Sequence, residues 1–181
     1  LRELEKLGFP IAETKWLDQG SSVNLTDLIQ RNGYSEYILK PVISAGAWQT
    51  WRIPVRDAHK YQPNVEEILS VSDAMLQPFF DEIVDTVEYS LPYIDNSYSH
   101  TTLKQPKNGD YRVQREHGGT YYPTEPNNDW IDLGNKLLKS LPHTPLYMRM
   151  DGIDRNGQFQ ILEVELLEPD LYTRFDEQAP R

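Results

Sequence analysis

Acidic residues near the C-terminal end have the types and spacing of a metal site. Arg149 and Asp151 lie in one segment that alternates between apolar and polar residues, and Glu163 and Glu165 lie in a second such segment. Because side chains alternate along a β-strand, each pair shares one face of its strand. Neighbouring carboxylates repel each other unless a cation lies between them, and oxygen ligands favour Mg²⁺ or Mn²⁺. The pattern therefore predicts a divalent metal site.

Whether Asp151 joins the two glutamates depends on the turn between the segments. A two-residue turn with a regular ladder would place Asp151 on the face opposite to Glu163. A three-residue loop that ends at Gly157 would pair Arg149 with Glu163 and bring the three carboxylates together, and glycine suits the left-handed position of that loop. We predict the three-residue loop, and with it metal ligands at Asp151, Glu163 and Glu165. The plainer interpretation is a solvated strand face that carries ordinary acids.

Basic residues in the middle of the chain could bind a phosphate chain. His100, Thr102 and Lys104 alternate along one strand face, and Arg112 follows on the return strand after an Asn-Gly turn. Phosphate requires such a gathering of cations. A pair of surface basic residues fits the pattern equally well, and His100 by itself is more typical of a structural role.

A lysine in the first half of the chain is a second candidate for phosphate binding. Lys40 lies in an apolar strand and is followed by a loop of small residues that includes Ser44 and Gly46. A lysine in such a strand must extend to solvent or meet an anion, and small residues let backbone N–H groups approach phosphate. The chain has no Gly-x-x-x-x-Gly-Lys-Ser/Thr motif, which excludes a P-loop.

An apolar segment at 75–80 could form the floor of a purine pocket, with Glu88 across from it. Aromatic strands are more often plain core. Pro78 implies an edge strand or an interrupted strand there, because proline cannot donate to a ladder. Such a strand leaves backbone groups available to a ligand.

Helices and strands must position these residues. Capping residues and helical spacing predict helices at 1–8, 24–33, 64–70 and 128–141. Runs of β-branched and aromatic residues predict strands at 36–43, 50–53, 74–80, 86–94, 98–104, 111–116, 146–153 and 159–167. Short strands with few long crossovers indicate antiparallel sheets and an α+β class. A boundary near 77–78 separates the helix-bearing first part from the strand-rich second part.

Composition excludes several classes of protein. The 181 residues include 28 acidic and 18 basic side chains, for a net charge of −10, and no cysteine. The absence of cysteine excludes disulfide scaffolds, zinc–thiolate sites and thiol nucleophiles. Nucleic-acid binding is disfavoured because it needs clustered Lys and Arg, and no apolar run approaches membrane-spanning length, so we expect a cytoplasmic protein without a membrane or nucleic-acid partner. A homo-oligomer remains open.

Taken in chain order, these motifs resemble those of the ATP-grasp superfamily. Lys40 and its loop resemble the lid-strand lysine and phosphate loop, and 76–80 resembles the hinge that clamps adenine. Glu88 matches the ribose-binding glutamate, and Lys104 matches the later phosphate lysine. The stretch at 109–119 is similar to one in the branch that contains RimK-type ligases and prokaryotic glutathione synthetases. The surroundings of Ser99 and Glu163 are similar to those of a branch that includes a D-cycloserine-forming ligase.

The C-terminal motifs extend this resemblance. Arg149 matches the arginine that faces the transferring phosphoryl group, and Asp151, Glu163 and Glu165 match the metal-binding positions. Glu165 replaces the asparagine that is usual in many members. The phosphate loop, with Gly46, has one glycine where many members have several.

The resemblance implies a two-lobed fold of the α+β class, whose mostly antiparallel sheets clasp the nucleotide. Residues 1–76 would form a linker and the small lid lobe, and 77–181 the large lobe with the metal site. The cofactors would be ATP and Mg²⁺ (or Mn²⁺), and the catalytic residues would be Arg149, Arg112 and Lys104. The nucleotide would be bound by Lys40, Ser44, Gly46, Gln77, Pro78, Phe79, Phe80, Glu88 and Lys104.

The resemblance also implies a ligase. A small-molecule carboxylate would attack the γ-phosphoryl group of Mg-ATP, and an amine would then displace phosphate from the acyl phosphate. Because the chain opens at Leu1 without a methionine, we expect an N-terminal portion to be absent, where family members usually place part of the acceptor site. Two other functions remain open: a nucleotide-binding module that does not ligate, and a phosphotransferase.

Overall fold

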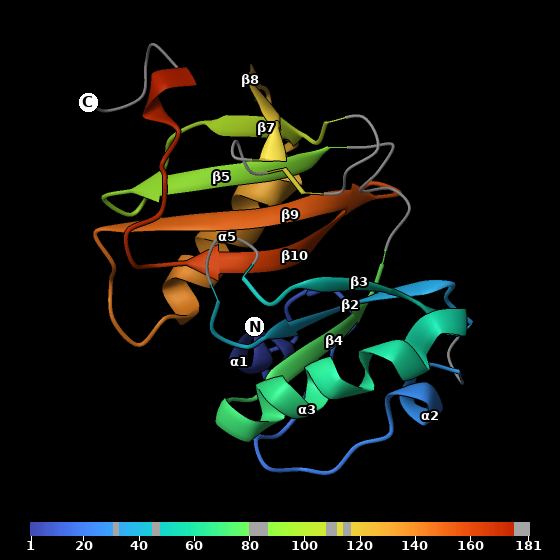
Figure 1. Ribbon diagram of the computed structural model, residues 1–181. Helices are drawn as coiled ribbons and strands as arrows, with labels where there is room; N and C mark the ends of the chain where they lie inside the picture. The colour runs from blue at the N-terminus through green and yellow to red at the C-terminus, as the bar shows by residue number, and fades with distance from the viewer. Residues whose placement is uncertain (31–32, 45–47, 80–86, 108–111, 114–116, 176–181) are drawn as a thin grey trace. The chain divides into compact units, whose positions relative to one another are not determined.

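Two compact units make up the computed structural model, which describes residues 1–30, 33–44, 48–79, 87–107, 112–113 and 117–175. The larger unit comprises Leu1–Ile11 and Glu82–Arg181, and the smaller unit comprises Ala12–Asp81. Each has its own antiparallel sheet (Figure 1). The α+β class predicted from the sequence is therefore confirmed. The boundary between two lobes at residues 76 and 77 stays a prediction. Residues Leu1–Ile11 belong to the larger unit.

The smaller unit is a four-stranded sheet with helices packed on it. Its strand order is β1-β4-β2-β3. The strands are β1 (Lys15–Leu17), β2 (Glu36–Pro41), β3 (Trp51–Pro54) and β4 (Ala74–Pro78). The helical segments are α2 (Leu25–Ile29), the 3₁₀ helix η1 (Val55–Tyr61) and α3 (Gln62–Val71).

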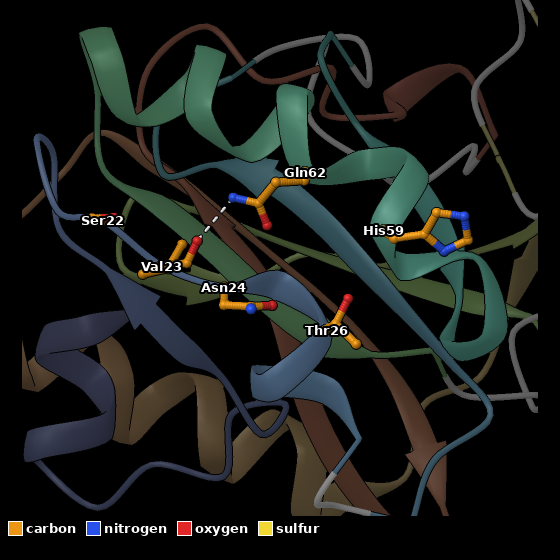
Figure 2. Close-up of a pocket in the computed structure, with 6 residues that line it drawn as sticks. All are labelled: Ser22, Val23, Asn24, Thr26, His59 and Gln62. Carbon is orange, nitrogen blue, oxygen red and sulfur yellow. Dashed lines mark hydrogen bonds between the residues drawn. The ribbon is translucent and has the colours of Figure 1, made fainter.

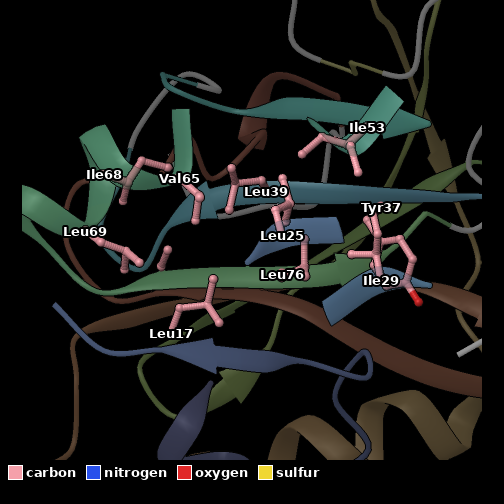
Figure 3. Packing of buried hydrophobic residues seen from close by; sticks show 12 residues of the cluster. Leu17, Leu25, Ile29, Tyr37, Leu39, Ile53, Val65, Ile68, Leu69 and Leu76 are labelled. Atoms are coloured by element: carbon pink, nitrogen blue, oxygen red, sulfur yellow. The ribbon is translucent and has the colours of Figure 1, made fainter. Parts of the chain in front are cut away.

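Helical spacing of apolar residues creates the core of the smaller unit. Val65, Ile68 and Leu69 lie on one face of α3 and are buried. They pack with Leu39 of β2 and Leu76 of β4, as Figure 3 shows. Alternation along β2 buries every second residue, so that Tyr37, Leu39 and Pro41 face the protein interior.

The larger unit contains a six-stranded sheet. Its main order is β10-β9-β5-β7-β8, and the short β6 pairs with β5. The strands are β5 (Glu88–Ile94), β6 (Ser97–Tyr98), β7 (Thr101–Gln105), β8 (Thr120–Thr124), β9 (Tyr147–Arg155) and β10 (Gln158–Glu165). The helical segments are α1 (Arg2–Lys6), α5 (Asn128–Ser140) and the 3₁₀ helix η3 (Thr173–Phe175).

Helix α5 covers the apolar face of this sheet (Figure 1). The helix begins after Asn127, whose side chain accepts a hydrogen bond from the Asp129 N–H at 3.0 Å. Trp130 and Leu137 on α5 are buried against Met148 and Met150 of β9. Because side chains alternate, Arg149 between those methionines and Asp151 after them face the other side of the sheet.

The β9–β10 hairpin differs from its prediction in the turn. The turn has two residues, Asn156 and Gly157, both in the left-handed region (φ 55° and 84°), so the predicted three-residue loop is wrong. The three carboxylates nevertheless share one face, because the register shifts at a β-bulge between Ile161 and Glu163. Glu163 then lies opposite Asp151. The bulge adds a residue to one strand and so restores the shared face that a regular ladder would have lost.

Other predicted elements are also revised. Strands β1 and β8 and the 3₁₀ helix η1 have no counterpart in the sequence prediction. The strand predicted at 98–104 is interrupted, because β6 ends at Tyr98 and β7 begins at Thr101. Most of the strand predicted at 111–116 lies outside the described residues, and Arg112 and Val113 belong to none of the strands in the described part of the chain.

The contact between Gly134 of α5 and Tyr93 of β5 generates a stability prediction. A Cβ atom at Gly134 would lie 2.0 Å from Tyr93 Oη, and that hydroxyl donates to the Ile131 carbonyl at 3.0 Å. In an exposed helix, glycine to alanine gains about 1 kcal/mol. Here we expect Gly134→Ala to lower the free energy of unfolding by about 1–3 kcal/mol because the helix must move off the sheet. Urea unfolding measures the change, with Lys136→Ala on the exposed side of α5 as the control. A stabilised Gly134→Ala protein would contradict the packing.

Candidate functional site

Polar side chains line the face of the larger sheet that α5 does not cover. The strand register sets them opposite one another: Glu165 with Arg149, Glu163 with Asp151, and Glu88 with Lys104. Ser90 on β5 lies opposite Asp151 on one side and Thr102 on the other. Residues directly opposite in an antiparallel pair share a face. One sheet face therefore gathers charged groups from β10, β9, β5 and β7.

Asp151 lies at the centre of this group and is 1% exposed. Its carboxylate accepts hydrogen bonds from Arg149 Nε at 2.9 and 3.1 Å and from the Ser90 hydroxyl. The ammonium nitrogen of Lys104 is 3.5 Å away. Burial alone raises the pKa of Asp151, but the charges of Lys104 and Arg149 outweigh burial, and the pKa lies below its ordinary value. Asp151 is therefore a buried anion.

Lys104 is the buried cation of the site, at 3% exposure. Its ammonium forms an ion pair with Glu88. Burial alone lowers the pKa of Lys104, but the charges of Asp151 and Glu88 hold the pKa above its ordinary value. Lys104 therefore keeps its charge, as a phosphate-binding lysine must.

Arg149 connects three parts of the site. Its Nη2 donates to Glu165 at 2.6 Å, and its Nη1 donates to the backbone carbonyl of Asp170 at 3.0 Å. Its Nε donates to Asp151, as described above. Burial alone lowers the pKa of Arg149, and the charge and hydrogen bonds of Asp151 raise it above the ordinary value. Arg149 therefore orients two of the predicted metal ligands.

The predicted metal ligands lie together. One oxygen each of Asp151, Glu163 and Glu165 falls within 4.8 Å of the other two. The set contains only carboxylate oxygens, as Mg²⁺ and Mn²⁺ prefer. Burial is the main cause of a raised pKa at Glu165, which a bound cation would counteract. These residues fit a divalent cation.

The net charge of the cluster also favours a bound divalent cation. Four carboxylates, on Glu88, Asp151, Glu163 and Glu165, share the face with two cations, Lys104 and Arg149. These six side chains carry a net charge of −4 + 2 = −2, which one divalent cation neutralises. Since buried like charges are costly, the balance favours an added cation over an added anion alone.

Lys40, Gln77 and Pro78, three of the residues predicted to bind the nucleotide, lie on β2 and β4, and Ser44 follows β2. Lys40 is half-buried near the end of β2, opposite Met75. The Ser44 hydroxyl donates to the Trp48 carbonyl at 2.9 Å. The buried Gln77 side chain donates to the Thr14 hydroxyl at 2.9 Å, and the buried Pro78 lies opposite Tyr37. Gly46 and Phe80 lie outside the described residues.

Phe79 and Glu88, predicted to contact the nucleoside, have protein partners. The Arg52 guanidinium lies 3.7 Å from the centroid of the Phe79 ring and is paired with Glu36. An arginine therefore packs on this aromatic ring. Glu88 is paired with Lys104, as described above. Binding of ribose by Glu88 stays a prediction.

Arg112, His100 and Thr102 are the remaining residues that the sequence placed in the candidate phosphate site. Arg112 is half-buried and lies outside the strands of the described part of the chain. His100 is buried, and its Nδ1 lies 2.9 Å from the Ser99 hydroxyl. Thr102 is buried beside Ser90 on the polar face. The catalytic role of Arg112 stays a prediction.

Sequence reasoning missed three participants. Ser90 carried no signal, because a single serine in an apolar strand is common. Asp170 and Tyr172 contact Arg149 from the segment after β10. The spacing of Asp170 and Arg174, which form an ion pair at 2.6 Å, was a weak signal of local order.

A pocket of about 360 Å³ lies in the smaller unit (Figure 2). A hydrogen bond from Gln62 to the Val23 carbonyl, at 2.9 Å, crosses it. It is lined by Ser22, Val23, Asn24, Thr26, His59 and Gln62. This lining contains no carboxylate, lysine or arginine, so the pocket lacks the charge cluster of the larger unit.

No protein-family model matches this chain, and no curated protein matches it by sequence. Comparison with solved structures is informative. D-cycloserine synthetase DcsG superposes with a TM-score of 0.82 at 22% identity, over 97% of this chain and 63% of that chain. ATP-grasp ligase PsnB, complexed with minimal precursor, superposes with a TM-score of 0.67 at 18% identity, over 99% and 53% of the two chains. This chain has the ATP-grasp fold.

D-alanine–D-alanine ligase from Bacillus anthracis is a third solved structure that is similar to this chain. It superposes with a TM-score of 0.70 at 14% identity, over 92% of this chain and 54% of that chain. The chain thus spans between half and two thirds of the length of these three ATP-grasp structures. Among the helices in the described ranges, none has both the length and the apolar character needed to cross a membrane.

The buried ion pairs of the charge cluster generate a prediction about stability. Lys104→Met keeps much of the side-chain volume but leaves Asp151 and Glu88 without their ammonium partner. We expect the free energy of unfolding to fall by about 3–5 kcal/mol, because the cluster then has four carboxylates and Arg149 as its one remaining cation. Lys6→Met removes an exposed ion pair, to Glu3 at 3.1 Å, and should change little. Urea unfolding compares the two variants, and equal stabilities would contradict the account of Lys104.

Proposed function

We propose that this protein is an ATP-dependent carboxylate–amine ligase that works through an acyl phosphate. The observation that carries the proposal is the three-carboxylate group of Asp151, Glu163 and Glu165, held beside Lys104 and Arg149 on one sheet face. The fold supports it, because the solved structures with this fold include ligases. One of those structures is described as complexed with ATP, and another as complexed with Mg and ADP.

Phosphoryl transfer requires positioning and charge neutralisation more than it requires a protein nucleophile. Bound at Asp151, Glu163 and Glu165, a Mg²⁺ or Mn²⁺ ion would neutralise negative charge on the phosphate oxygens. The absence of cysteine from the chain is compatible with this chemistry. The first bond to form would join a substrate carboxylate oxygen to the γ-phosphorus as the bond to ADP breaks. An amine would then form the amide as phosphate leaves.

The chain's own residues have defined tasks in this proposal. Lys104 presents a permanent positive charge to a phosphate oxygen, and the carboxylates of Glu88 and Asp151 keep its ammonium in place. Arg149 holds Asp151 and Glu165 in the orientation that a cation needs, and its charge stabilises developing oxyanion charge. We propose that Arg112, also in this unit, assists in the same way.

Residues of the smaller unit would bind the nucleotide. We propose that Lys40, Ser44 and Gly46 contact the phosphates and that the 77–80 segment contacts the adenine, with Glu88 of the larger unit on the ribose. The order of these residues along the chain supports the assignment. We further propose small-molecule carboxylate and amine substrates, a cytoplasmic location and a RimK-type or glutathione synthetase-like mode of action.

The metal site generates a mutational prediction. Glu163 is exposed, so Glu163→Gln should leave the fold intact while it removes one anionic metal ligand. We expect the rate of Mg²⁺-dependent ADP formation to fall by roughly 100-fold or more. Direct Mn²⁺ binding, measured by electron paramagnetic resonance, should weaken in parallel. Glu125→Gln, at an exposed glutamate of the same unit, is the matched control. Unchanged Mn²⁺ affinity in Glu163→Gln would remove the metal assignment.

The reaction class is tested by a substrate screen with the full-length protein. ADP and phosphate release from Mg-ATP is measured with a panel of carboxylates and amines, and products are identified by mass spectrometry. A ligase forms ADP, phosphate and an amide only when both substrates are present. A phosphotransferase forms ADP and a stable phosphorylated product without an amide. ATP binding with no turnover for any pair indicates a nucleotide-binding module and refutes the ligase.

A further inference from the structure

A C-terminal segment, Asp170–Phe175, packs against the charge cluster and is called the strap below. The Asp170 carbonyl accepts a hydrogen bond from Arg149 Nη1 at 3.0 Å. The Asp170 carboxylate accepts from the Tyr172 N–H at 2.9 Å and from both Nη atoms of Arg174, at 2.9 and 2.6 Å. Asp170 thus ties the strap to Arg149 and stabilises the turn of the strap itself.

Tyr172 brings its ring to the cations of the site. The ring centroid is 5.4 Å from Arg149 Cζ, 5.8 Å from Lys104 Nζ and 5.6 Å from Arg174 Cζ. All three distances fall within the 6 Å range of cation–π attraction. Tyr172 is 6% exposed, so the attraction acts in a poorly hydrated environment where it is strongest. Burial raises the pKa of Tyr172 to about 12, so the phenol stays neutral at physiological pH.

The backbone of Tyr172 is held in an unfavourable conformation. Its φ of +56° lies in the left-handed region, which a bulky residue rarely adopts. Such a conformation persists only where the surroundings determine it, and it is concentrated at functional sites. Two aromatic neighbours fix the ring here: Tyr121 at 5.2 Å and Phe175 at 6.3 Å between centroids. Tyr121 lies directly opposite Lys104 on the sheet.

We propose that Tyr172 is a positioning residue for phosphoryl transfer, which uses its ring to hold Arg149 and Lys104 at fixed places over the carboxylate cluster. Two like charges near one another repel, and the negative face of an aromatic ring within 6 Å of both offsets the repulsion. The ring also covers the cations from water, which strengthens their effect on developing negative charge. The proposal rests on the proposed ligase function.

The ring, and not the hydroxyl, performs this task. The proposal is therefore tested by comparing a variant that keeps the ring with one that removes it. Tyr172→Phe keeps the ring, whereas Tyr172→Leu keeps apolar bulk without a π face. Tyr122→Leu makes the same change at an exposed tyrosine on the same strand as Tyr121 and serves as the matched control. All variants are made in the full-length protein.

The first readout is kinetic. In Tyr172→Leu we expect kcat to fall by about 10–100-fold with the KM for ATP within a few-fold of wild type, because misplaced cations act mainly on the transition state. Tyr172→Phe should restore kcat to near the wild-type value, and Tyr122→Leu should not change it. A wild-type kcat in Tyr172→Leu, or an equal loss in Tyr172→Phe, overturns the proposal.

The second readout does not depend on catalysis. Trypsin cleaves after Arg174, and we expect the docked strap to protect that bond because the Asp170–Arg174 ion pair, at 2.6 Å, holds the Arg174 side chain. Cleavage at Arg174, followed by mass spectrometry, should be at least several-fold faster in Tyr172→Leu than in wild type or Tyr172→Phe. Equal cleavage rates overturn the docking of the strap by the ring. Failure of wild type to form ADP with any substrates overturns the ligase function, and the cleavage comparison still decides whether the ring holds the strap.

Discussion

The buried carboxylate of Asp151 is the constraint on which the larger unit depends. An anion that is 1% exposed is stable only with cations and donors around it. Lys104, Arg149 and Ser90 supply them from three different strands. Strand order and register must therefore be correct to within one residue. The same arrangement keeps negative charge in surplus at Glu163 and Glu165, where a divalent cation fits.

The two faces of the larger sheet differ: one packs against helix α5, and the other carries the charged residues. One face packs Met148 and Met150 under helix α5, where close contacts such as that of Gly134 with Tyr93 leave little room for change. The alternate residues of the same strand, Arg149 and Asp151, form the centre of the charged face. A close-packed apolar layer thus restricts the movement of the charged groups on the opposite face. The aromatic ring of Tyr172 lies 5.8 Å from Lys104 Nζ and 5.4 Å from Arg149 Cζ, the two cations of the charged face.

Much of the fold and of the candidate site could be predicted from local pattern. Alternation placed Arg149 with Asp151 and Glu163 with Glu165, and helical spacing predicted α5 almost to its ends. The turn prediction was wrong, because glycine at 157 suits both a two-residue and a three-residue connection. Strands β1 and β8 were missed, because three residues at 15–17 and a proline within 120–124 carry little strand signal. Gln77 and Phe79 were correctly placed on a strand or next to it, but their partners Thr14 and Arg52 are distant in sequence.

The sequence by itself determined which residue types alternate on each strand, the α+β class and the oxygen-only chemistry of the C-terminal carboxylates, because these follow from short-range periodicity and from side-chain type. The tertiary structure alone decided that a bulge after Ile161 returns Glu163 to the face of Asp151. It also decided that Asp170 and Tyr172 contact Arg149. The physical reason is that register and contact energy across strands depend on residues far apart in the chain, whose pairing a local pattern does not specify.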